Sequence, residues 1–256
     1  NHGYRMKSYG PVSLIKLEDS KTLIEKQINT ILATFENFEI VLCVGFEAVK
    51  IVSFVREKFK NINIRIVENQ VHYNSNCCES IRLCLANITN SKVIICGGGV
   101  LIYPSQFSSL DFSESMIIVQ NQIDDSNFEV GVIPTTNNKV NRLSLGVKTK
   151  YWAEILFLYD QESIDYLLRI VSNTDYKNKF KVADDAFYET QSGKNILALN
   201  KAFGFEGRGK KNLLDKFTDQ TKEGLYNLGI KIQQNLSNKP IIKIDNIKTL
   251  RKTTKI

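Results

Sequence analysis

The first residues of the chain include types that could hold a phosphorylated ligand. Gly3, Arg5 and Lys7 alternate along this segment, and Gly10-Pro11 follows as a turn. Glycine lets a ligand approach the backbone closely, and arginine makes forked hydrogen bonds to phosphate oxygens. Glycine and arginine at this spacing are common in unrelated sequences, so the segment also reads as an ordinary polar N-terminus.

A second candidate region is the glycine run at residues 97–99, directly after an apolar strand. Three glycines in succession could bring the backbone close to a ligand, or could simply form a tight turn at the end of the strand. The chemistry of both regions depends on the elements that position them.

The first half of the chain alternates apolar strands with amphipathic helices. Helices are predicted at 22–35, 47–59 and 76–88, and strands at 39–45, 62–67, 92–96 and 115–120. Strands that alternate with helices of about this length indicate βαβ units and a mostly parallel sheet.

The second half of the chain begins with predicted strands that are separated by turn residues instead of helices. Short segments separated by turn residues predict antiparallel or edge strands at 128–134, 139–147 and 152–158, and a helix follows at 162–171. Further helices are predicted at 196–202 and 212–234, a last strand at 240–244, and a basic helix from residue 246.

Bulk composition narrows the class of protein. The 256 residues are 43% apolar and 24% charged, which suits one large α/β domain or a domain with an appendage. No apolar run approaches the roughly 20 residues of a membrane helix, so no membrane partner is expected. The net charge of +7 suits phosphate-bearing ligands, but the lysines are widely spread, and nucleic acid is not an expected partner. Five cysteines without a regular framework predict reduced thiols and a cytoplasmic location.

Several longer patterns occur in a fixed order. Gly-Tyr-Arg-Met starts at Gly3, Pro-Val-Ser-Leu starts at Pro11, and Lys-Thr-Leu-Ile starts at Lys21. The strand Ile-Val-Leu-Cys-Val-Gly-Phe ends at Phe46, and a polar region with Asn74, Asn76 and Ser80 follows. Together these pieces, over roughly residues 3–105, resemble the sugar-phosphate and phosphocholine nucleotidyltransferases.

The resemblance implies an α/β fold, namely the Rossmann-like three-layer nucleotide-diphospho-sugar transferase fold, with a mixed sheet and a C-terminal helical appendage. It implies a single domain over 1–256, in which 1–125 forms the nucleotide-binding half. Residues 126–256 would then form the acceptor and metal half, with a helical C-terminal part.

The resemblance also implies roles for residues. The ligands expected from it are a nucleoside triphosphate, with CTP as a candidate, and a phosphorylated sugar or alcohol. The residues expected to contact the nucleotide are Gly3, Arg5, Lys7, Asn74, Asn76, Ser80, Gly98 and Gly99. Arg5 and Lys16 are the expected catalytic residues.

Members of this family hold Mg²⁺ with two aspartates, since Mg²⁺ requires hard oxygen ligands. Asp245, in Lys-Ile-Asp-Asn, matches the second position, and Asp185 in the pair Asp184-Asp185 offers another carboxylate. This acidic pair also suits a helix N-terminus, where the helix dipole favours negative charge.

The chain departs from the family pattern at two positions. Val12 stands where the family has lysine, and Gly99 stands where it has the first aspartate. The resemblance therefore leaves two readings: a Mg²⁺-dependent nucleotidyltransferase that releases pyrophosphate with impaired activity, or an inactive relative that serves as a structural or protein-interaction subunit. A glycosyltransferase of this broad fold would carry Asp-x-Asp after the central strand, which is absent here. In the nucleotide readings, the N-terminal turn and the glycine run converge on one pocket.

Overall fold

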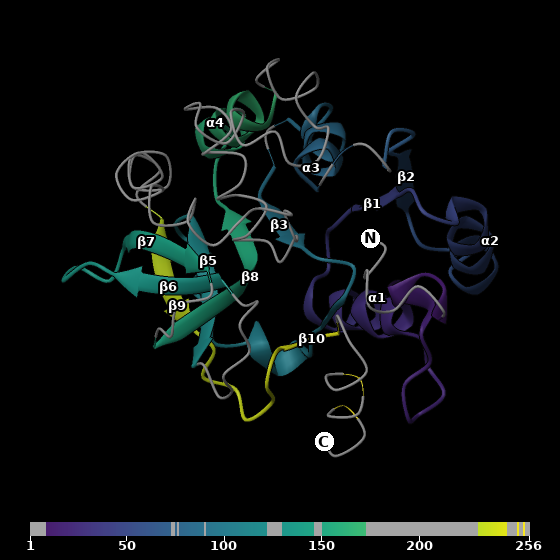
Figure 1. Ribbon diagram of the computed structural model, residues 1–256, viewed down its shortest axis with the longest axis horizontal. Coiled ribbons are helices and arrows are strands. Elements are labelled where there is room, and N and C mark those ends of the chain that lie inside the picture. The colour runs from purple at the N-terminus through teal and green to yellow at the C-terminus, as the bar shows by residue number, and fades with distance from the viewer. Residues whose placement is uncertain are drawn as a thin grey trace. The chain divides into compact units, whose positions relative to one another are not determined.

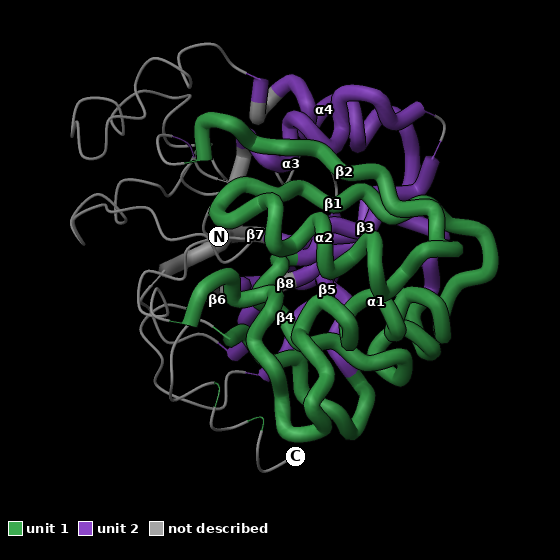
Figure 2. Tube along the Cα trace, turned by 90° about the vertical axis from the view of Figure 1, so that its right-hand side faces the viewer, with its two compact units in different colours: residues 1–72, 97–110, 236–256 green, residues 73–96, 111–235 purple. Residues whose placement is uncertain are grey.

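The computed structural model describes residues 9–72, 75, 77–89, 91–121, 130–145, 150–172, 230–244, 250 and 253. The chain forms two compact units, coloured separately in Figure 2. Unit 1 comprises residues 1–72, 97–110 and 236–256, and unit 2 comprises residues 73–96 and 111–235. These packing boundaries differ from the expected halves, 1–125 and 126–256, whose functional assignment stays a prediction.

Unit 1 is an α/β unit. Its helices and strands are the 3-10 helix η2 (Val12–Leu14), α1 (Leu23–Thr34), β1 (Ile40–Val44), α2 (Ala48–Lys58), β2 (Ile64–Glu68), β4 (Val100–Leu101), the 3-10 helix η3 (Pro104–Gln106) and β10 (Ile242–Lys243). β1 and β2 pair in parallel, with Ile40 opposite Ile64, and α2 makes the crossover between them. This βαβ unit is the parallel arrangement that the sequence predicts.

Helix α1 starts with a capping box. The Thr22 hydroxyl accepts a hydrogen bond from the Glu25 N–H at 3.3 Å, and the Glu25 carboxylate accepts one from the Thr22 N–H at 3.4 Å. Two N–H groups that the first helical turn leaves unpaired are thereby satisfied. The Lys58 ammonium lies 3.2 Å from the Glu25 carboxylate and balances its charge.

The apolar core of unit 1 has two clusters of buried side chains. The first cluster joins α1 to β1 and α2 and consists of Ile24, Ile28, Val44, Ile51 and Val55. The second cluster, called here the apolar floor, consists of Val12, Ile15, Leu17, Leu23, Leu101, Ile242 and Ile244. The apolar floor draws on three distant parts of the sequence, and the antiparallel pairing of β4 with β10 brings the last of them in.

Unit 2 contains most of the β-structure (Figure 1). Its elements are α3 (Cys77–Leu85), β3 (Val93–Cys96), β5 (Met116–Asn121), β6 (Val130–Pro134), β7 (Val140–Leu145), β8 (Tyr151–Leu158), α4 (Gln161–Val171) and β9 (Lys231–Gln234). Helices α3 and α4 pack against each other. Among the described helices of the chain, none is long and apolar enough to cross a membrane.

The sheet of unit 2 is mixed. Its strand order is β7-β6-β8-β5-β9, and β3 also pairs with β8. β5 and β9 are parallel, whereas β8 runs antiparallel to β3, β5 and β6. The four residues Met116–Val119 of β5 are all buried, as expected for a strand covered on both faces.

The two ends of this strand order meet at the β6–β7 turn. The Ile232 N–H of β9 donates to the Asn138 carbonyl at 2.9 Å, and the Val140 N–H donates to the Ile230 carbonyl at 3.0 Å. The Asn138 side-chain amide also donates to the Ile232 carbonyl, at 2.8 Å. The turn of one hairpin therefore pairs with β9, and the sheet returns on itself.

The expected mixed α/β fold is confirmed, with corrections in detail. The prediction of a mostly parallel sheet holds for β1 and β2, but β3 and β5 both pair antiparallel with β8. The helix predicted at 212–234 is wrong at its end, because residues 231–234 form β9. Its earlier part, the helix predicted at 196–202 and the helix predicted from residue 246, which together would make the C-terminal appendage, lie outside the described residues apart from positions 250 and 253.

Candidate functional site

The candidate site is the glycine turn that follows β3. The Val100 N–H donates to the Gly97 carbonyl at 3.1 Å, which closes a four-residue turn with Gly98 and Gly99 at its centre. Neither central glycine has a positive φ, so the turn conformation alone does not require glycine. A Cβ atom at Gly98 would meet nothing within 4 Å, and Gly98 is exposed.

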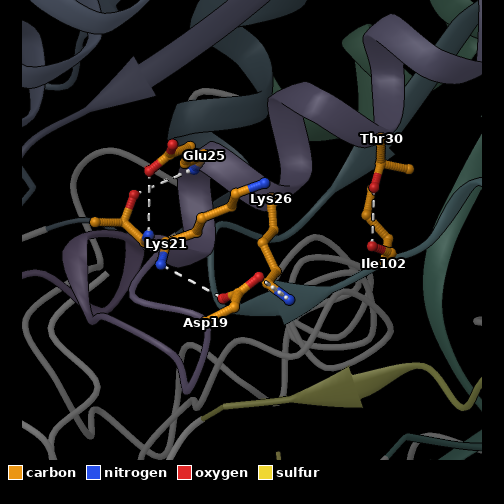
Figure 3. A network of polar contacts seen from close by, with 7 residues as sticks. Asp19, Lys21, Glu25, Lys26, Thr30 and Ile102 are labelled. Carbon is orange, nitrogen blue, oxygen red and sulfur yellow. Dashed lines mark hydrogen bonds and ion pairs between the residues drawn. The ribbon is translucent and has the colours of Figure 1, made fainter.

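Gln27 of α1 holds this turn from the inside. Its side-chain Nε2 donates to the Gly97 carbonyl at 2.9 Å and to the Val100 carbonyl at 2.7 Å. One turn further along α1, the Thr30 hydroxyl donates to the Ile102 carbonyl at 3.0 Å (Figure 3). The α1 helix therefore fixes the chain from Gly97 to Ile102 through backbone carbonyls.

Gly99 lies at the meeting point of three segments. A Cβ atom at Gly99 would lie 3.6 Å from Cγ1 of Val12 and 3.2 Å from the carbonyl oxygen of Ile244. The Ile244 N–H donates to the Gly99 carbonyl at 2.7 Å. The described end of the N-terminal segment therefore converges with the glycine run, and the strand that precedes Asp245 joins them.

The two departures from the family pattern are thus neighbours in space. Val12 is 5% exposed and belongs to the apolar floor. Where the resemblance implies a lysine and an aspartate, the structure has a buried isopropyl group against a bare backbone. The sequence showed both substitutions, but their contact follows only from the fold.

The residues described around Gly99 do not fit Mg²⁺. Among described residues, no carboxylate atom lies within 4 Å of a Cβ at Gly98 or Gly99. No group of three or more His, Cys, Asp or Glu side chains forms a metal site in the described part of the chain. Mg²⁺ requires near-octahedral oxygen coordination, and one carbonyl beside an apolar side chain does not supply it.

The N–H groups of the glycine turn are hydrogen-bond donors and therefore suit an anion, not a metal ion. In the part of the chain that the structure describes, the N–H groups of Gly98 and Gly99 donate to no acceptor. The Gly97 and Gly99 carbonyls, in contrast, accept the bonds given above. Among the described residues the turn therefore offers two N–H donors, which suit an anionic oxygen, and one carbonyl acceptor, that of Gly98.

The other proposed site residues fall into two groups. Lys16 is exposed and lies between buried Ile15 and Leu17, so it does not share their position in the apolar floor. Ser80 is half-buried on α3 of unit 2. The remaining predicted site residues, which lie outside the described residues, are Gly3, Arg5, Lys7, Asn74, Asn76, Asp185 and Asp245.

A polar cluster stands beside the apolar floor, around Lys26 (Figure 3). The Lys26 ammonium lies 2.9 Å from the Asp19 carboxylate. Burial raises the pKa of Asp19, but the hydrogen bond and the charge of Lys26 lower it. The lowering outweighs the effect of burial, so the pKa of Asp19 lies below its ordinary value. Burial raises the pKa of Tyr103, against the charge of Lys26. At neutral pH the Asp19 carboxylate therefore stays charged and the Tyr103 phenol stays neutral, which argues against general acid–base work by either group.

Sequence reasoning missed Gln27 and Thr30. A signal was present, because Leu23, Gln27 and Thr30 recur at helical spacing and share one face of α1. Polar residues on a face that also carries a buried leucine must find partners there. That these partners are the carbonyls of Gly97, Val100 and Ile102 could not be read from spacing.

Comparison with known proteins gives a fold likeness. No family model and no curated protein matches the chain. Among solved structures it is similar to the CTP:phosphocholine cytidylyltransferase from Streptococcus pneumoniae, at 20% identity and a TM-score of 0.64, over 99% of this chain and 93% of that one.

Two further solved structures show the same likeness. One is the inositol-1-phosphate CTP transferase from T. maritima, at 13% identity and a TM-score of 0.62, over 100% of this chain and 92% of that one. The other is the nucleoside-diphosphate-sugar pyrophosphorylase from Vibrio cholerae RC9, at 13% identity and a TM-score of 0.65, over 99% of this chain and 96% of that one. At these identities the likeness shows the fold: this chain has the Rossmann-like α/β fold of the nucleotidyltransferases.

Proposed function

We propose that this protein binds a nucleoside triphosphate, with CTP as the first candidate, together with a phosphorylated sugar or alcohol, and that its transfer activity is impaired. The observation that carries the proposal is the convergence of the N-terminal segment, the glycine turn and the strand before Asp245 at Gly99. The fold likeness supports it, since two of the similar structures are named as enzymes of CTP.

The N-terminal segment would hold the phosphates. Gly3, Arg5 and Lys7 supply a close backbone approach and two cations, and the N–H groups of Gly98 and Gly99 add donors. Arg5 and Lys16 are the residues that we propose stabilise charge during transfer. Lys16 is exposed, so its side chain has the freedom to reach a bound ligand.

The nucleoside would lie against the region that contains Asn74, Asn76 and Ser80. Amide and hydroxyl groups of this kind can hydrogen-bond a base and a ribose. Asp185 and Asp245 are the proposed carboxylates of the site, and Asp245 directly follows Ile244 in the sequence.

In the transfer reaction, an oxygen of the acceptor phosphate would attack the α-phosphorus of the nucleotide. The new phosphorus–oxygen bond forms as the bond to the β-phosphate bridging oxygen breaks, and pyrophosphate leaves. Loss of one charged stabiliser typically lowers the rate on the order of 10²–10³. Val12 and Gly99 stand in place of two such groups, the family's lysine and aspartate. We therefore expect turnover far below that of an enzyme that has both.

The second candidate function is a catalytically inactive subunit that binds a protein partner. The buried contact between Val12 and the backbone at Gly99 favours it, because an apolar floor contributes to stability but offers no charge to a transition state. A nucleotide could still bind to such a subunit.

A thermal-shift series tests the proposal. The protein is heated with each of ATP, CTP, GTP and UTP, with and without Mg²⁺, and pyrophosphate release is followed in parallel with phosphocholine and sugar phosphates. We expect at least one nucleotide to raise Tm, since a ligand that binds only the folded state stabilises it. No shift with any nucleotide at millimolar concentration would contradict both nucleotide readings.

A matched pair of arginine variants locates the binding. Arg5→Ala is expected to weaken nucleotide binding by about tenfold or more, because forked contacts to phosphate are lost. Arg56→Ala, on the exposed side of α2, should leave affinity unchanged. Equal effects of the two variants would show that binding reflects the overall positive charge.

A further inference from the structure

We infer that positions 12 and 99 form one coupled unit, and that their joint replacement leaves a nucleotide site whose affinity does not depend on a divalent cation held at Gly99. The inference rests on the proposed function, since it concerns how the nucleotide is held. It goes beyond impaired turnover, because it concerns nucleotide binding and whether the glycine turn contacts a phosphate or a cation.

The coupling follows from distance. Cγ1 of Val12 lies 3.6 Å from the Cβ position of residue 99, so a side chain at position 99 would start in van der Waals contact with Val12. A lysine and an aspartate here would compensate each other, whereas either one alone would be a charge beside apolar groups. An aspartate alone would face the methyl groups of Val12 and the Ile244 carbonyl oxygen, which lies 3.2 Å from its Cβ.

The cation preference follows from the donors and acceptors that remain. The carbonyl oxygens of Gly97 and Gly99 already accept hydrogen bonds from Gln27 and Ile244 respectively. Within the described residues, the turn still offers the N–H groups of Gly98 and Gly99 and one carbonyl, that of Gly98. A single carbonyl oxygen does not supply the coordination that Mg²⁺ requires. N–H groups attract a phosphate oxygen and repel a metal ion. A phosphate would therefore meet this turn directly.

The test of cation dependence uses the wild-type protein. The affinity for CTP, or for whichever of the four nucleotides gives the largest thermal shift, is measured by calorimetry in Mg²⁺ and in EDTA. We expect the two Kd values to agree within about threefold. A larger loss of affinity in EDTA would overturn the inference, although nucleotide binding itself would then stand. Absence of binding in both conditions would instead count against the proposed function.

The test of coupling needs no nucleotide. Tm is measured for Val12→Lys, Gly99→Asp and the double variant. We expect the double variant to lose clearly less than the sum of the two single losses, because each new charge then has a partner. Additive losses would overturn the coupling.

Two further measurements keep the coupling falsifiable. Ser13→Lys places the same charge one residue away, at a half-buried position outside the apolar floor, and should combine additively with Gly99→Asp. In the Val12→Lys/Gly99→Asp double variant, we expect Mg²⁺ to tighten nucleotide binding by more than about threefold. If a variant does not fold, the comparison of Mg²⁺ with EDTA in the wild type still decides the cation dependence.

Discussion

At the scale of single residues, Gln27 connects α1 to the candidate site. Its one side-chain nitrogen serves two carbonyls, those of Gly97 and Val100. Both bonds are partly buried, so losing them leaves carbonyl groups short of donors. These two bonds hold the turn from Gly97 to Val100 against α1.

Replacing Gln27 tests this role. Gln27→Ala should lower the free energy of unfolding by about 1–3 kcal/mol. Gln27→Glu should lower it further at neutral pH, because a carboxylate would face two carbonyl oxygens. That site raises the pKa of the new carboxyl group, so the extra loss should shrink as pH falls and the group protonates. Urea unfolding at several pH values measures both effects.

The matched control is Gln70→Ala. Gln70 is exposed, and its replacement should change the free energy of unfolding by less than about 0.5 kcal/mol. A Gln27→Glu protein as stable as the wild type at neutral pH would contradict the two hydrogen bonds.

The sequence located the two departures from the family pattern but not their relation. Val12 and Gly99 are recognised in the sequence because their residue types differ from those of the family pattern. Their contact depends on η2, β4 and β10 being assembled together, and β4 and β10 are each only two residues long. Strands this short carry no periodic signal, because alternation needs about four residues to be seen.

At the scale of elements, the β6–β7 turn is the joint that closes the sheet of unit 2. Asn138 has a φ of 56°, in the left-handed region, and makes backbone and side-chain hydrogen bonds to Ile232. Asparagine tolerates this conformation better than most residues with a side chain. The same residue therefore shapes the turn and pairs it with β9.

Two substitutions separate these contributions. Asn138→Gly keeps the conformation and loses only the side-chain bond, so it should lower the free energy of unfolding by about 1 kcal/mol. Asn138→Ala also strains the backbone and should lower it by about 2 kcal/mol or more. Exposed Asn137→Ala is the control and should be nearly neutral. Thermal and urea unfolding measure the order, and equal effects of the three variants would contradict it.

Elements with strong local signals were predictable. The capped, amphipathic α1 and the βαβ unit of β1, α2 and β2 were found in place, within one or two residues. β9 was missed because Lys-Ile-Gln-Gln is polar, short and continuous with a helical pattern. The antiparallel pairing of β3 with β8 was missed because partners separated by more than fifty residues leave no mark on local periodicity.

At the scale of the whole molecule, each unit depends on segments far apart in the chain. The apolar floor of unit 1 includes Ile244, which is 1% exposed. Unit 2 depends in the same way on Ile232 of β9, which is 2% exposed. Two compact units with separate cores are expected to open as separate cooperative regions.

Reciprocal substitutions test this division. Ile244→Ala and Ile232→Ala should each lower stability by about 2–4 kcal/mol. Amide hydrogen exchange should then quicken at β4 and α1 in the first variant, and at β5 in the second. A uniform increase over both units in either variant would show that the chain opens as one body instead.

The interleaved order of segments also bears on how the protein is made. During synthesis, η2 and α1 are made before Ile242 and Ile244, which follow them by roughly 200 residues in the sequence. At roughly 5–20 residues per second, the growing chain holds an incomplete apolar surface for on the order of ten seconds. Growing chains should therefore be good clients for chaperones until Ile242 and Ile244 have emerged.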